Sequence, residues 1–128
     1  MGLSIGQVSE RTGLSVHALR FYEREGLLAE PVRRDPGGRR VYSEDDLEWL
    51  EMCIMLRATG MPLPDVRRYT DLVKAGDGNA EQRVTLLREH EQRVLAQRAQ
   101  LDTCLELVRY KISHYTEVSA APPAPRSS

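Results

Sequence analysis

Polar and apolar residues between positions 5 and 24 recur at helical spacing, with one tight turn between two short helices. Ser4 and Gln7 have the spacing of a capping box, which begins the first helix. Gly13 suits the end of that helix, because glycine adopts a positive φ at little cost. Ser15 can then cap the second helix. The pattern predicts a helix, a turn and a second helix.

Three further elements follow in the hydrophobic pattern. Residues 33–42 are rich in arginine around a glycine pair and predict a hairpin. Ser43 and Asp46 form another capping box, at the start of a helix that runs to about Ala58. This helix is apolar nearly all round, so we expect it to be buried. Two prolines then open a helix over residues 62–74.

A heptad repeat dominates residues 79–117, which contain neither proline nor glycine. Its seams are 87, 94, 101, 108, 115 and 84, 91, 98, 105, 112, of which eight of ten are apolar, as in a coiled coil. The preceding 75 residues are too few to cover so long a helix, so we expect it to pair with a second copy. Glu91 and Arg98 interrupt the seam, either as a pair across an antiparallel dimer or as solvated charges. The expected dimer interface comprises Leu87, Val94, Leu101, Leu105, Val108 and Ile112.

These elements predict a mainly α fold with a winged helix-turn-helix head, a two-helix connector and a long C-terminal coiled-coil dimerisation helix. The head with its connector covers residues 1–75, and the dimerisation helix covers 79–117. Residues 118–128 are rich in proline, alanine and serine, and we expect a disordered tail there.

Composition narrows the function classes. The 128 residues carry a net charge of −1, which argues against bulk non-specific binding of nucleic acid. The charge is unevenly distributed, however: residues 1–42 hold seven arginines and five acidic residues, whereas residues 43–128 carry a net −3. No apolar run is long enough for a signal peptide or a membrane span, so we expect a cytoplasmic protein. Two cysteines are too few for a disulfide framework.

A helix-turn-helix followed by a basic hairpin is a layout for reading DNA. In the second helix His17, Arg20 and Arg24 fall on faces other than the apolar one. An arginine such as Arg20 can bind guanine or phosphate, and a tyrosine hydroxyl such as that of Tyr22 can donate to phosphate. Arg39 follows the glycine pair and is presented by the hairpin turn.

Several motifs in order resemble the MerR family of transcription regulators. They span roughly residues 3–117 and include Ile5-Gly6-Gln7-Val8, Leu19-Arg20-Phe21-Tyr22-Glu23, Gly26-Leu27-Leu28, Gly38-Arg39-Arg40-Val41-Tyr42, Asp46-Leu47 and Leu56-Arg57-Ala58-Thr59-Gly60-Met61. The chain looks most like the short aldehyde- or stress-responsive members that lack a metal-binding loop. A set of motifs at consistent spacing is a specific signal, unlike a lone helix-turn-helix pattern.

The resemblance implies a homodimer that binds promoter DNA between elements separated by an over-long spacer. Bending and untwisting that DNA would bring the elements into phase for RNA polymerase, as an activator in one state and a repressor in another. The expected DNA-binding residues are Ser15, His17, Arg20, Tyr22, Arg39, Arg40 and Tyr42. Two alternatives stay open: His17 is an ordinary solvated residue, or Tyr42 packs beneath the hairpin.

Cys53 lies on the helix that carries a sensor thiol in some family members without a ligand domain. Packing is the plainer interpretation, because free cysteine is among the most buried residue types. Sensing of a reactive small molecule would require a depressed pKa, for which Arg57, four residues on, is a cationic neighbour.

No nucleophile with a base, metal-ligand cluster or cofactor motif is visible, so we expect no enzymatic activity, metal or cofactor. Nothing after Tyr115 is a cysteine or a histidine, unlike in metal-sensing relatives. Two other functions stay open. One is an architectural DNA-binding protein that needs no effector. The other is a small-ligand or electrophile-binding protein with a vestigial DNA head.

Overall fold

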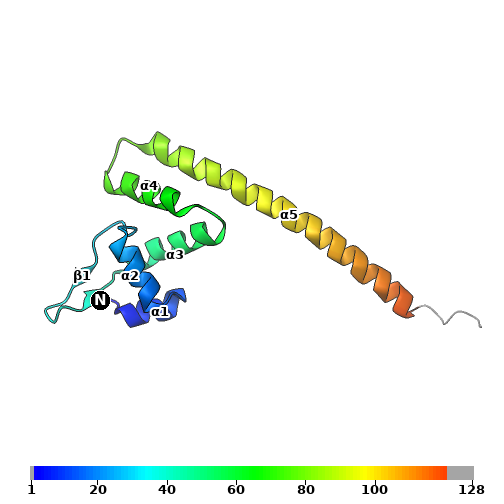
Figure 1. Ribbon diagram of the computed structural model, residues 1–128, viewed down its shortest axis with the longest axis horizontal. Coiled ribbons are helices and arrows are strands. Elements are labelled where there is room, and N and C mark those ends of the chain that lie inside the picture. The colour runs from blue at the N-terminus through cyan, green and yellow to red at the C-terminus, as the bar shows by residue number, and fades with distance from the viewer. Residues whose placement is uncertain (1, 121–128) are drawn as a thin grey trace, which may run out of the picture. The chain divides into compact units, whose positions relative to one another are not determined.

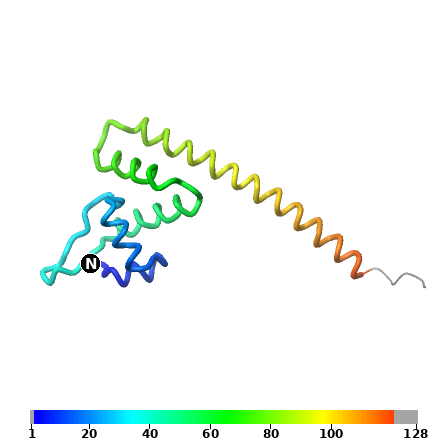
Figure 2. Tube along the Cα trace, in the orientation of Figure 1, coloured from blue at the N-terminus to red at the C-terminus, as the bar shows by residue number. Residues whose placement is uncertain are grey.

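The computed structural model describes residues 2–120, as five helices and one two-stranded hairpin (Figure 1). In chain order they are α1 (Ile5–Thr12), α2 (Val16–Arg24), β1 (Arg33–Arg34), β2 (Arg40–Val41), α3 (Glu44–Ala58), α4 (Leu63–Lys74) and α5 (Ala80–Ala120). The predicted mainly α architecture is therefore confirmed. The chain divides into two compact units, Met1–Glu91 and Gln92–Ser128, and the trace in Figure 2 follows both.

The caps predicted from the sequence begin α1 and α2. The Ser4 hydroxyl accepts a hydrogen bond from the Gln7 amide at 3.1 Å, and the Gln7 side chain accepts one from the Ser4 amide at 2.8 Å. Gly13 ends α1 with a φ of 77°, in the left-handed region that favours glycine. The Ser15 hydroxyl accepts from the Ala18 amide at 3.0 Å and caps α2. Local side-chain chemistry thus sets both helix starts.

The hairpin pairs β1 and β2 in antiparallel register, with Arg33 opposite Val41. The start of the chain extends this pairing, because Leu3 and Tyr42 exchange backbone hydrogen bonds of 2.7 and 2.8 Å. The hairpin, hereafter the wing (residues 33–41), is therefore tied at its base to the residues that precede α1.

The core of the first unit lies between α1, α2, α3 and α4. Its buried members are Val8, Leu19, Tyr22, Leu27, Leu28, Tyr42, Leu47, Leu50, Cys53, Met61 and Val66. Trp49 packs at the edge, where its indole donates to the Leu27 carbonyl at 2.7 Å and its ring stacks on Tyr69. The core is small and draws at least one residue from each of these four helices.

Helix α3 is buried on one side, contrary to the expectation that it would be buried all round. Leu47, Leu50 and Cys53 lie in the core, but Met55 is 64% exposed. The reason is that α3 buries only the face that enters the core, where it packs against α1 and α4, so Met55 on another face stays exposed. The apolar composition of α3 therefore predicted more burial than the structure shows.

Two contacts fix the start of α5. The Arg83 guanidinium donates to the Leu72 carbonyl, in the last turn of α4, at 3.1 Å and to the Gly76 carbonyl, beyond the end of α4, at 2.6 Å. Within α5, Leu86 and His90 are the buried residues, and His90 Nε2 lies 2.8 Å from the Thr59 hydroxyl.

The last part of α5 corrects the predicted boundary of the tail. Residues 118–120 belong to the helix, and only 121–128 of the predicted tail lie outside the described residues. In the unit from residue 92, many apolar side chains are exposed. No helix among the described residues is both long enough and apolar enough to cross a membrane.

Replacing Ser43 with alanine should lower the free energy of unfolding by about 1 kcal/mol, the usual contribution of such a cap. The Ser43 hydroxyl accepts from the Asp46 amide at 3.0 Å, and the Asp46 carboxylate accepts from the Ser43 amide at 2.9 Å. Urea unfolding followed by circular dichroism measures the change. Ser113→Ala, on an exposed face of α5, is the control and should not destabilise the protein. An equal effect of the two substitutions would contradict the capping role.

Candidate nucleic-acid interface

Helix α2 separates an inward face from an outward one. Leu19 and Tyr22 are buried, whereas His17, Arg20 and Arg24 are exposed. The exposed face therefore carries two guanidinium groups and one imidazole, with donors for phosphate and for base edges. The expected orientation of the three polar residues is found in the structure.

Tyr22 does not lie on this outward face. It is 8% exposed, and burial, with the Cys53 thiol as a lesser cause, raises the pKa of its phenol. Most of the Tyr22 side chain therefore packs in the core, and its phosphate contact stays a prediction. The three-residue spacing between Leu19 and Tyr22 predicts this burial, because it puts both side chains on one face of the helix.

Tyr42 is also in the core. Its side chain is fully buried beneath the wing, as in the second of the alternatives drawn from the sequence, and not at the surface as a phosphate ligand requires. Its hydroxyl has no hydrogen-bond partner among the described residues. Burial is the main cause that raises the pKa of this phenol, followed by the negative charge of Glu23.

The wing presents its arginines in two different ways. Arg39 is exposed on the turn, where its amide donates to the Asp35 carboxylate at 2.9 Å. Arg40 is partly buried and forms an ion pair with Glu23 of α2, and Arg34 lies 3.7 Å from the same carboxylate. Of the two arginines predicted to contact DNA, Arg39 is thus open to solvent, while Arg40 has a partner within the protein.

A shallow pocket of about 250 Å³ lies between α2 and the wing and is lined by Arg20, Glu23, Arg24 and Arg40. Glu23 belongs to a motif of the sequence, but its ion pairing could not be predicted, because its partners Arg34 and Arg40 are 11 and 17 residues away. Among residues 2–42, the exposed arginines without an ion pair are Arg20, Arg24, Arg33 and Arg39. These four guanidinium groups are open to a polyanion, and Arg20 and Arg24 lie together beside the pocket.

Cys53 lies in the core. Its side chain is fully buried, with Sγ 4.0 Å from the Leu27 carbonyl oxygen. Burial raises the pKa of the thiol to about 11. The Arg57 guanidinium, expected as a cationic neighbour, instead donates to the Met61 carbonyl at 2.9 Å. Cys104 on α5 is exposed.

Comparison with known proteins places the site in a family. The model of the MerR HTH family of regulatory proteins matches residues 3–72, which is more than half of the chain. The chain belongs to the MerR family. The resemblance inferred from the motifs is thereby confirmed.

Individual relatives agree with this assignment. An HTH-type transcriptional regulator of Haemophilus influenzae is 36% identical over 120 residues, which cover 94% of this chain and 88% of the relative. The regulator AdhR of Bacillus subtilis is 37% identical over 93 residues, or 73% of this chain and 66% of AdhR.

Solved structures agree as well. The structure of HiNmlR, a MerR family regulator lacking the sensor domain and bound to promoter DNA, matches with a TM-score of 0.82 and 36% identity. The match covers 94% of each chain. A MerR family regulator from Listeria monocytogenes matches with a TM-score of 0.80 and 28% identity, over 89% of this chain and 86% of that one. The present chain is therefore a MerR-family transcriptional regulator.

In this MerR-family regulator the environment of Cys53 contradicts the depressed pKa that thiol sensing requires. A buried thiol with a pKa near 11 is almost entirely protonated at neutral pH, whereas the thiolate is the nucleophile. The structure favours packing as the role of Cys53. No group of three or more metal-ligating side chains occurs in residues 2–120 either.

The Cys104→Ser variant, which keeps Cys53 as its one thiol, should react slowly with iodoacetamide when folded. We expect the native rate at pH 7.5 to be at least about 100-fold below that in urea, because only a small fraction is ionised and accessible. Mass spectrometry of the alkylated protein gives both rates. Similar rates in the two states would show that Cys53 is open to reagents.

Stability should depend on pH through the same thiol. The unfolded thiol ionises near pH 9 and the folded one near 11, so the unfolded state binds fewer protons between these values. The free energy of unfolding should therefore be unaffected by this group below pH 9 and should fall as the pH rises towards 11. Urea titrations should show a shallower decline for Cys53→Ala than for the wild type.

Proposed function

We propose that this regulator acts as a homodimer that reads two half-sites of a promoter and distorts the DNA between them. The observation that carries the proposal is the apolar face of α5, which is left uncovered in a single chain. The exposed side chains of its heptad seams include Leu101 at 64%, Leu105 at 45% and Ile112 at 59%. Exposure of so many large apolar side chains along one helix favours a protein partner.

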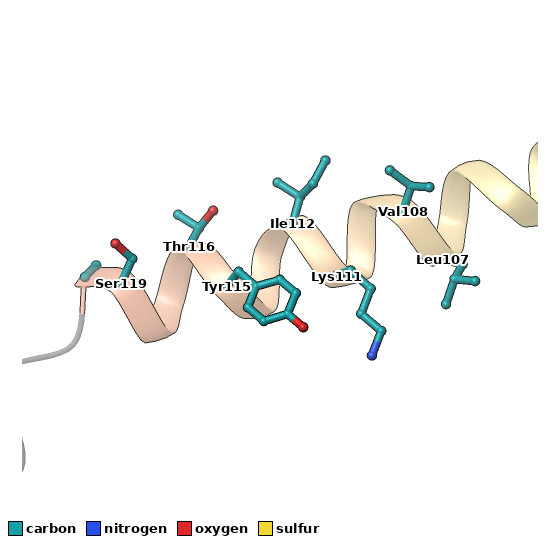
Figure 3. A pocket seen from close by; sticks show the side chains of 8 residues that line it. Leu107, Val108, Lys111, Ile112, Tyr115, Thr116 and Ser119 are labelled. Atoms are coloured by element: carbon teal, nitrogen blue, oxygen red, sulfur yellow. The ribbon is translucent and has the colours of Figure 1, made fainter.

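The C-terminal part of α5 carries a continuous apolar groove. It is lined by Leu107, Val108, Ile112 and Tyr115 among others, and Figure 3 shows Val108 and Ile112 projecting from the same side of the helix. Val108 and Ile112 are four residues apart, as expected for neighbours in a coiled-coil seam. Of the six residues predicted for the interface, five are exposed and Val94 is half-buried. A second α5 is the occupant that this repeat fits best.

Dimerisation would determine how DNA is read. A twofold dimer presents two copies of α2, whose separation must match the spacing of two half-sites. Sites that are spaced differently on relaxed DNA can be bound only if the duplex bends or untwists. Such distortion would place promoter elements in phase for RNA polymerase, with the deformation energy of the spacer contributing to specificity.

The geometry supports Arg20, His17 and Arg39 as direct DNA contacts, together with the exposed Ser15 at the start of α2. Tyr22 and Tyr42 would contribute indirectly, because their packing in the core holds α2 and the wing in place.

Regulation without an effector is the second candidate, favoured by the buried and protonated Cys53. A response to a reactive small molecule through that thiol would need a local opening of the packing between Leu27 and α3. An architectural role, in which the dimer shapes the promoter constitutively, needs no such step.

Arg20→Ala should weaken operator binding at least about tenfold, the loss expected for one bidentate base contact. It should leave the dimer intact, because Arg20 is an exposed residue of the head. Gel shifts with a duplex from upstream of the regulator's own gene measure the affinity. Arg109→Ala, the same change on the exposed surface of α5, is the control. Unchanged affinity of the Arg20 variant would remove this residue from the interface.

Leu105→Glu should convert the dimer into a monomer, because a charge in the seam would lose hydration without gaining a partner. Light scattering after size-exclusion chromatography gives the mass. Tyr110→Glu is the control, since this tyrosine is 65% exposed, five residues away, outside the heptad seams and not part of the apolar groove. If both variants remain dimers, or if both dissociate, the seam is not the interface.

A further inference from the structure

Glu23 is an acidic residue in the middle of a basic surface. It lies on α2, and its carboxylate lines the pocket formed with Arg20, Arg24 and Arg40. We propose that Glu23 is a specificity-determining residue, which occupies the place of a DNA phosphate in the free protein. It would restrain Arg34 and Arg40 of the wing and so weaken binding to non-operator DNA.

The contacts of Glu23 join three elements. One carboxylate oxygen accepts from Arg40 of β2, and the other lies 3.7 Å from Arg34 of β1. The side chains of Glu23 and Arg40 are only 25% and 24% exposed, so this pair is better shielded than the other ion pairs of the head. Arg34 is also held by a 3.0 Å hydrogen bond to the Gly38 carbonyl. The reading helix and both strands of the wing therefore meet at one carboxylate.

The first consequence concerns charge. Non-specific DNA binding comes almost entirely from counterions released when cationic side chains neutralise phosphates. Arg34 and Arg40 can contribute to this release only by giving up Glu23, and the carboxylate itself repels the DNA backbone. Glu23 therefore lowers the affinity for any duplex whose phosphates merely come near the wing.

The second consequence concerns position. Operator binding needs α2 in the groove and the wing on the backbone at a fixed separation, whereas non-specific binding has no such requirement. By tying Arg40 to α2, Glu23 keeps that separation in the free protein. Tyr42 packs beneath the same place, where the charge of Glu23 contributes to the raised pKa of its phenol. Removal of the carboxylate should then favour non-specific over operator DNA.

This inference rests on the proposed DNA surface, and its test measures operator and scrambled duplexes side by side by fluorescence anisotropy over a range of salt concentrations. Glu23→Gln removes the charge and keeps an acceptor for Arg40, while Glu23→Ala removes both. Glu23→Gln should bind the scrambled duplex about fivefold more tightly and the operator no more tightly. The salt dependence of scrambled-duplex binding should steepen by about one unit in log–log slope for each arginine released. Glu23→Ala should in addition bind the operator more weakly.

Glu25→Gln is the matched control. Glu25 follows α2 and pairs with Arg67 of α4 at 3.1 Å, so the variant loses the same charge outside the wing. It should leave the ratio of operator to scrambled affinity unchanged. The proposal is overturned if Glu23→Gln tightens both duplexes by the same factor, or tightens neither. A wild type that shows no operator preference would instead refute the proposed function. Thermal melting confirms that each variant is folded. If Glu23→Ala does not fold, Glu23→Gln alone tests the proposal.

Discussion

The whole head depends on how α2 is rotated about its axis. Nine residues have to bury one face in a small core and offer the other to DNA. Leu19 and Tyr22 fix that rotation, because both are held in the core among residues of α1, α3 and α4. Arg20 lies between them in the sequence and is consequently directed outwards. Core packing and DNA reading are thus two results of one constraint.

The same packing explains why the Cys53 thiol, on the core side of the head, is unreactive. The Leu27 carbonyl, just beyond α2, accepts from the Trp49 indole and lies beside the Cys53 thiol. Burial there raises the pKa of the thiol and stabilises its protonated form. Any signal that enters at Cys53 has to loosen the packing around Leu27, just beyond the end of α2.

Local signals in the sequence predicted the elements well. The caps at Ser4, Ser15 and Ser43 are made by short-range hydrogen bonds, so the helix starts follow from neighbouring residues alone. The family motifs and the helical heptad region are likewise patterns along the chain. The corrections concern the burial of α3 and the boundary of the tail, because Met55 is exposed and residues 118–120 are helical. Burial also decided between alternatives that the sequence left open: Tyr42 packs beneath the wing, and the raised pKa of the Cys53 thiol favours packing over sensing.

By itself, the sequence determined where helices begin, that the chain belongs to a DNA-reading family, and that one long helix has an unpaired apolar face. Only the tertiary structure decided which tyrosines face inwards and that Glu23 meets Arg34 and Arg40 across the wing. The physical reason is range. Capping and periodicity act over three to seven residues, whereas burial and ion pairing depend on elements that come together from distant parts of the chain.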